Sequence, residues 1–82
     1  MTKRSRNTIL SKILGICSNG ANKTRIVYQA NLNFRTVGPY LKLLSDNGLI
    51  DVKDGKMVIY ETTQRGQNLM EDIKLAQNGL GI

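Results

Sequence analysis

Residues 22–48 read NKTRIVYQANLNFRTVGPYLKLLSDNG and carry the signals for two helices joined by a tight turn. Asn22 is a favourable N-cap for a helix over residues 23–30, because its side chain can accept a hydrogen bond from a first-turn backbone N–H. A short turn follows, and Asn33 can cap a longer helix that runs to about Asp46. The closing Asn-Gly pair supplies the left-handed stop that is typical of a helix C-terminus.

Helical periodicity divides the longer helix into two faces. The apolar face, which we expect to join the core, comprises Phe34, Val37, Leu41 and Leu44. The opposite face is basic and polar and comprises Arg35, Pro39, Lys42 and Asp46, with Thr36 beside them. Because an interior proline removes a backbone donor, this helix is expected either to kink at Pro39 or to begin later, near Thr36.

The flanking segments complete the order of elements. Apolar residues at helical spacing predict a first helix over residues 6–18. Two strands are predicted at 49–53 and 56–61, around Asp54-Gly55, which is a strong signal for a two-residue hairpin turn. Three helices, a hairpin and a further C-terminal helix make an α+β, mostly helical fold, and a chain of 82 residues has room for a single domain.

The last helix is predicted to start at a Thr62 or Thr63 cap and to run to about Asn78. Its segment 63–78 is the expected dimerisation helix, because heptad-spaced apolar residues form a narrow seam and another leucine lies nearly opposite. The expected interface residues are Leu69, Ile73, Leu75 and Ala76. The alternative is that the seam covers the core of its own domain, since so short a repeat fits both arrangements.

Charge is distributed unevenly along the chain. Residues 1–45 contain eight basic residues and no acidic one, whereas residues 46–82 contain four basic and six acidic residues. Such asymmetry indicates a nucleic acid or an anionic membrane surface as partner, with a merely solvated basic face as the alternative. Residues 1–5 either form a basic arm that follows DNA or are simply a soluble terminus.

Residue types that enzymes and metal sites need are missing or scattered. The chain has no histidine, and its six carboxylates lie at separate turns and helix ends. We therefore expect no enzyme activity, no metal site and no cofactor. The single cysteine, Cys17, falls on an apolar helical stripe, so a buried, unreactive thiol in a cytoplasmic protein is expected. No segment approaches a membrane-spanning length, and we expect no membrane partner.

The sequence resembles the archaeal winged helix-turn-helix family of small DNA-binding proteins and transcription regulators. The stretches that carry the resemblance are residues 20–34, 40–44 and 47–50 and the run YETTQRG at 60–66. The similarity covers about residues 9–73. It implies DNA binding by a homodimer whose last helices pair as an antiparallel coiled coil.

The order of elements is itself the plan of a winged helix-turn-helix domain, in which the second helix of the pair enters the major groove. We therefore expect helix 33–46 to read the major groove of double-stranded DNA and the wing at 50–61 to contact its backbone or minor groove. The expected DNA-binding residues are Lys23, Thr24, Arg25, Asn33, Arg35, Thr36, Lys42, Lys53 and Lys56. A solvated outer face on helix 33–46 and protection of a strand edge by the wing lysines are the alternatives.

These features predict a homodimeric transcription regulator that acts in the cytoplasm in association with the nucleoid. One alternative is a non-specific chromatin or architectural DNA-binding protein, which needs the same charge but not the same reading of bases. The other is a protein-interaction module, because winged helices also serve as docking domains. The base-reaching side chains of helix 33–46 count against this last alternative.

Overall fold

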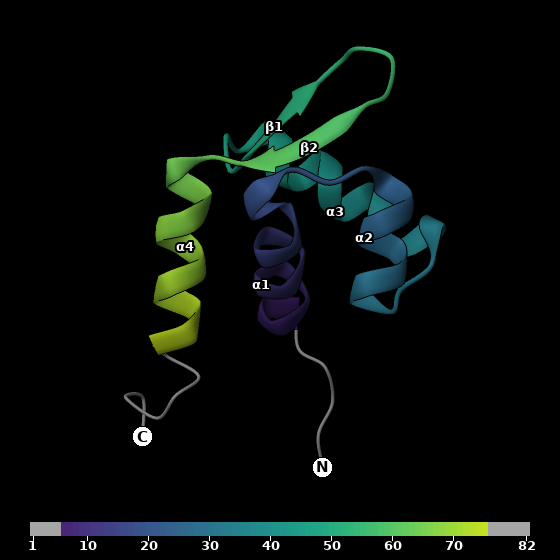
Figure 1. Cartoon of the computed structure of the whole chain (residues 1–82). Coiled ribbons are helices and arrows are strands. Elements are labelled where there is room, and N and C mark those ends of the chain that lie inside the picture. The colour runs from purple at the N-terminus through teal and green to yellow at the C-terminus, as the bar shows by residue number, and fades with distance from the viewer. Residues whose placement is uncertain (1–5, 76–82) are drawn as a thin grey trace.

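A computed structural model describes residues 6–75 of the chain and shows a mostly helical α+β architecture (Figure 1). The elements in order are α1 (Arg6–Ile16), the short 3-10 helix η1 (Cys17–Asn19), α2 (Lys23–Ala30), α3 (Phe34–Asp46), β1 (Ile50–Lys53), β2 (Ile59–Thr62) and α4 (Gln64–Leu75). The expected basic arm at residues 1–5 and the expected interface residue Ala76 lie outside the described residues. The predicted plan of three helices, a hairpin and a further helix is confirmed.

Helix α1 stands at the centre, between α4 on one side and α2 on the other, and the hairpin lies across one end of it (Figure 1). Its Ile13, Leu14 and the following Cys17 are fully buried, and Ile26 of α2 and Leu44 of α3 complete the middle of the core. Burial raises the pKa of the Cys17 thiol to about 12. The thiol therefore stays protonated at neutral pH, as expected for a structural cysteine.

Both predicted asparagine caps are confirmed. The side-chain oxygen of Asn22 accepts a hydrogen bond of 2.8 Å from the Arg25 N–H, and the side-chain oxygen of Asn33 accepts one of 2.8 Å from the Thr36 N–H. Asn31, between the two helices, adopts the left-handed conformation with φ at 58°. The two caps fix where α2 and α3 begin, and Asn31 ends α2, so together they set the direction of α3.

Phe34 departs from the prediction. Val37, Leu41 and Leu44 are buried as expected, but Phe34 is 51% exposed. The residue that covers the start of α3 is instead Leu32, which packs against the core one position before the cap, while Val37 is buried at the fourth helical position. This is the arrangement of a hydrophobic staple, and it leaves the first helical position outside the core.

Pro39 lies inside α3, which runs as one helix from Phe34 to Asp46. The helix does not begin near Thr36, so the later start considered from the sequence is wrong. Pro39 sits in the second turn, on the exposed side of the helix, and supplies no N–H for the carbonyl of Arg35.

The hairpin also differs from the prediction, because its turn is longer than Asp54-Gly55. Ile50 pairs with Thr62 and Lys53 pairs with Ile59, so residues 54–58 form the loop. The reason lies outside the hairpin, on the free edge of β2. There Ala21 exchanges two backbone hydrogen bonds with Tyr60, of 3.0 and 2.8 Å. The buried Thr62 hydroxyl also donates to the Leu14 carbonyl over 2.7 Å.

Helix α4 is capped by Thr63, the second of the two predicted caps. The Thr63 hydroxyl oxygen accepts a hydrogen bond of 3.1 Å from the Gly66 N–H and donates one of 2.7 Å to the Gly48 carbonyl. Ile73, expected in a dimer seam, is only 7% exposed and belongs to the chain's own core. Its stripe on α4 continues through Met70 to Gly66 and packs against α1.

Gly66 is expected to tolerate no side chain. A Cβ at this position would collide with the Leu49 carbonyl oxygen and the Thr62 methyl group. Because the backbone must move to relieve the clash, Gly66→Ala should destabilise the fold by about 1–3 kcal/mol in denaturant unfolding. Gly15→Ala on α1 is the matched control, since its Cβ would meet only Met70 Sδ at 3.6 Å. The control should not destabilise, and equal losses in both variants would contradict the argument.

Candidate nucleic-acid interface

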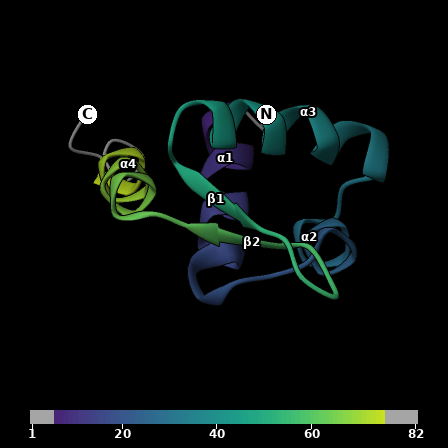
Figure 2. The same ribbon diagram turned by 90° about the horizontal axis from the view of Figure 1, so that it is seen from above.

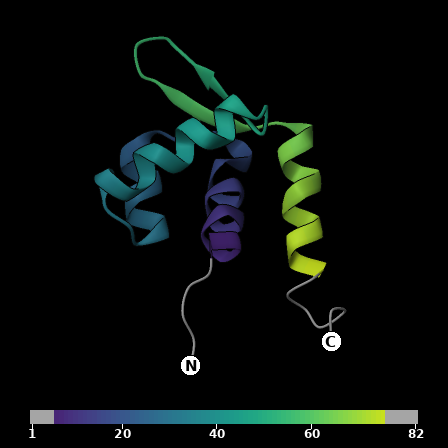
Figure 3. The same ribbon diagram turned by 180° about the vertical axis from the view of Figure 1, so that it is seen from behind.

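Three elements meet on one side of the molecule: the first turn of α2, the outer face of α3 and the wing, defined as residues 50–62 (Figures 2 and 3). Between them lies a cleft of about 260 Å³, here called the α3–wing cleft. Its lining residues are Lys23, Gly38, Leu41, Lys42, Ser45, Asp46, Val52 and Tyr60. Two of the expected DNA-binding lysines, Lys23 and Lys42, therefore line the same cleft.

The first turn of α2 is built to face an anion. Asn22 uses its side chain for the Arg25 N–H and its carbonyl for the Ile26 N–H, so the N–H groups ahead of them point out of the helix end. Thr24 and Arg25 are exposed there. Free N–H groups and the positive end of a helix dipole together favour a phosphate.

The side chain of Lys23 reaches from α2 towards Gly38 of α3. The Lys23 Nζ lies 3.5 Å from the point where a Cβ of Gly38 would stand. This is an ordinary van der Waals distance, and Lys23 and Gly38 both line the α3–wing cleft.

Lys42 carries an acidic neighbour that lies in the same cleft. Its Nζ is 3.3 Å from the Asp46 carboxylate, one turn along α3, and both side chains are largely exposed. Such a surface pair contributes little to stability. Its consequence is electrostatic, since the Asp46 charge opposes the approach of a phosphate to Lys42.

The two wing lysines are not equivalent. Lys53 forms an ion pair with Glu61 on the neighbouring strand. The hydrogen bond that Lys53 donates to this carboxylate, together with the negative charge of Glu61, raises the pKa of Lys53 above its ordinary value. Lys56 lies in the exposed loop and forms no ion pair with any other residue that the structure describes. The wing also carries the carboxylates Asp51 and Asp54. Because Lys53 is already paired with Glu61, Lys56 is the wing cation best placed to meet a second molecule.

The remaining predicted residues divide by their access to solvent. Arg35 is exposed on the outer face of α3, as expected, whereas Thr36 is half-buried. Asn33 is exposed, but its side-chain oxygen is already used by the cap, so only its amide N–H groups are free to donate. Ser45 and Tyr60 were not predicted, although both line the cleft. The helical spacing of Ser45 from Lys42 was a usable signal, while Tyr60 depends on the strand register.

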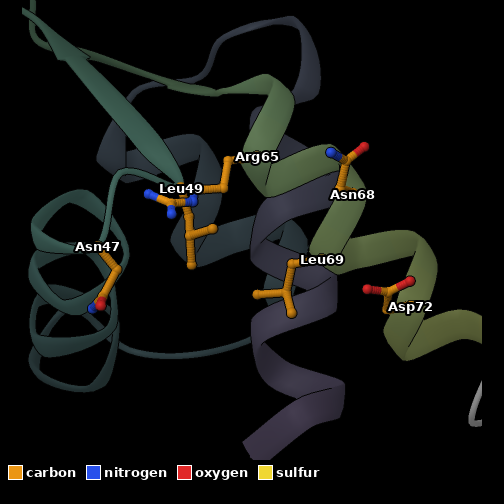
Figure 4. A pocket seen from close by; sticks show the side chains of 6 residues that line it. All are labelled: Asn47, Leu49, Arg65, Asn68, Leu69 and Asp72. Carbon is orange, nitrogen blue, oxygen red and sulfur yellow. The ribbon is translucent and has the colours of Figure 1, made fainter.

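A second concave surface lies between α4 and the end of α3 (Figure 4). It has a volume of about 480 Å³ and is here called the α4 groove. Its lining residues are Asn47, Leu49, Arg65, Asn68, Leu69 and Asp72. Of the expected dimer residues, Leu69 lies in this groove and Leu75, one turn after Asp72, is 53% exposed.

Within residues 6–75, no cluster of three His, Cys, Asp or Glu side chains is arranged to hold a metal ion. The same part of the chain contains no helix with the length and hydropathy needed to cross a bilayer.

The chain belongs to the winged helix-turn-helix family, whose pattern it matches over residues 3–79. The protein MJ0290 of Methanocaldococcus jannaschii is 37% identical over 73 residues, which are 88% of this chain and 33% of that protein. The chain thus spans about a third of this relative. MJ0287 of the same organism is 36% identical over 72 residues, covering 87% of this chain and 71% of the relative.

Among solved structures, the chain is similar to Sso10a-2, a DNA-binding protein from Sulfolobus solfataricus. The TM-score is 0.87 and the sequence identity 29%, over 92% of this chain and 80% of that chain. The predicted resemblance to archaeal winged-helix proteins is confirmed.

Asp46 provides a direct test of the α3–wing cleft. Asp46→Asn keeps the size of the side chain and removes the negative charge beside Lys42, so affinity for duplex DNA should rise about two- to fivefold. Fluorescence anisotropy at fixed salt measures the change. Glu71→Gln, an exposed carboxylate on α4, is the charge-matched control and should have a smaller effect. An equal gain in both variants would mean that only net charge matters.

Proposed function

We propose that this protein is a homodimeric transcription regulator that binds double-stranded DNA in the cytoplasm, in association with the nucleoid. The observation that carries the proposal is the α3–wing cleft. It gathers Lys23 from the start of α2 and Lys42 from α3 beside the wing. The DNA-binding description of Sso10a-2 supports the same conclusion.

In this proposal the outer face of α3 enters the major groove. Arg35, whose planar guanidinium can hold two acceptors, reads a base edge, and the amide of Asn33 and the hydroxyl of Thr36 contact bases or backbone nearby. Lys23, Thr24, Arg25 and Lys42 contact phosphates and fix the orientation of α3. The wing contacts the backbone or the minor groove through Lys56, and through Lys53 once its pair with Glu61 opens.

Selection of bound fragments from random duplex DNA, followed by titration at several salt concentrations, tests this function. With about five phosphate contacts per subunit, the logarithm of affinity should fall with the logarithm of salt at a slope of about −4 to −5 per subunit. Arg35→Ala should cost about 1–3 kcal/mol and flatten the preference among sequences. Lys74→Ala, an exposed cation in the last turn of α4, is the control and should do neither.

The outcomes separate the alternatives. Steep salt dependence without a selected motif would favour a non-specific architectural protein. In such a protein, replacing Arg35 or another cation would lower the affinity for all DNA sequences alike. A salt slope near zero would remove DNA as the partner. The exposed face of α3 would then be a docking surface for another protein.

The dimer is proposed to form through the α4 groove. Arg65 and Asp72 are equally distant along α4 from the point between Asn68 and Leu69. A two-fold axis at that point, with two α4 helices antiparallel, places each Arg65 opposite the Asp72 of the second copy. The same axis brings the two Leu69 side chains close together.

Charge reversal tests this arrangement. Arg65→Asp or Asp72→Arg alone sets like charges against each other across the proposed axis, so each should weaken the dimer in analytical ultracentrifugation. The double variant restores both pairs and should recover the dimer. Circular dichroism confirms folding, since both residues are exposed. A monomeric wild type, or a double variant no better than the singles, would overturn the proposed pairing.

A further inference from the structure

Phe34 is an aromatic residue that lies half exposed outside the core. It is 51% exposed at the first position of α3, while Leu32 and Val37 close the core around the start of this helix. Leaving a large apolar side chain in water forgoes the free energy that its burial would supply. The exposed half of Phe34 is therefore available to contact a partner.

The position of Phe34 points to the partner. In a helix-turn-helix domain, the N-terminal residues of the second helix contact base edges in the major groove. Phe34 precedes Arg35, the residue proposed to read a base. The turn that carries both is held by Asn33, which binds the Thr36 N–H through its side chain at 2.8 Å and the Val37 N–H through its carbonyl at 3.0 Å. Phe34 is thus presented on a fixed turn of backbone.

The chemistry of the major groove narrows the target to one group. Base edges there offer hydrogen-bond donors and acceptors, which a phenyl ring cannot satisfy, together with the C5 methyl group of thymine. We propose that Phe34 determines sequence specificity by packing against a thymine methyl group, at a base close to the one that Arg35 reads. This inference rests on the proposed DNA-binding function and adds to it an apolar contact that selects one base.

Deoxyuridine isolates the proposed contact, because it pairs as thymine does and lacks only the methyl group. Each thymine of the selected duplex is replaced in turn. Wild-type affinity should fall about three- to fivefold at one or two positions, as expected for one methyl group withdrawn from an apolar contact. Phe34→Ala should bind the thymine and deoxyuridine duplexes equally, and Phe34→Leu should retain part of the difference.

Tyr28→Ala is the control, because Tyr28 is an exposed aromatic residue, 79% accessible, on α2 instead of α3. It should keep the full sensitivity to deoxyuridine. Unchanged thermal melting of Phe34→Ala shows that folding is intact. If the wild type binds duplex DNA but no deoxyuridine substitution weakens it, or if Phe34→Ala keeps the sensitivity, the inference is wrong and the proposed function stands. If the wild type binds no duplex, both are wrong.

Discussion

The side of the molecule that carries the α3–wing cleft depends on one pair of backbone hydrogen bonds, between Ala21 and Tyr60. These bonds, of 3.0 and 2.8 Å, join β2 to the segment that links η1 with α2. As a result β2 has β1 on one edge and Ala21 on the other, although the sheet proper has two strands. The wing is therefore fixed beside the start of α2, and Lys23 and Tyr60 come to line one cleft.

The same bonds explain which parts of the fold could be predicted from the sequence. Helix starts depend on neighbours within a turn, so Asn22 and Asn33 marked them correctly. The hairpin register depends on contacts distant in sequence. A two-residue turn at Asp54-Gly55 would shift the pairing by an odd number of residues and so reverse the faces of β2. That shift would lose the bonds at Ala21 and the burial of Thr62.

The residue types of the candidate site could be predicted from the sequence. Which of their polar groups are free to bind a partner could be predicted less well. Helical spacing gives the direction of a side chain around its axis, which placed Arg35 and Lys42 on the outer face of α3. Helical spacing does not show which side chains already form a hydrogen bond or an ion pair within the chain. Lys53 is engaged by Glu61, and the oxygen of Asn33 is consumed by its own helix cap. Phe34 was wrongly predicted to join the core for a related reason. Helical periodicity does not show that Leu32, which precedes the helix, already covers its first turn.

Helix α4 connects the two proposed surfaces, because it lines the α4 groove and starts beside the end of α3. Its Met70 and Ile73 pack inward, whereas Arg65, Asn68 and Asp72 line the α4 groove. The start of α4 is tied to the end of α3 through the bond from Thr63 to Gly48 and the close packing of Gly66 on Leu49. A dimer formed through the α4 groove would therefore fix the separation of the two α3 helices. Half-site spacing on DNA would follow from that separation, since each α3 reads one half-site.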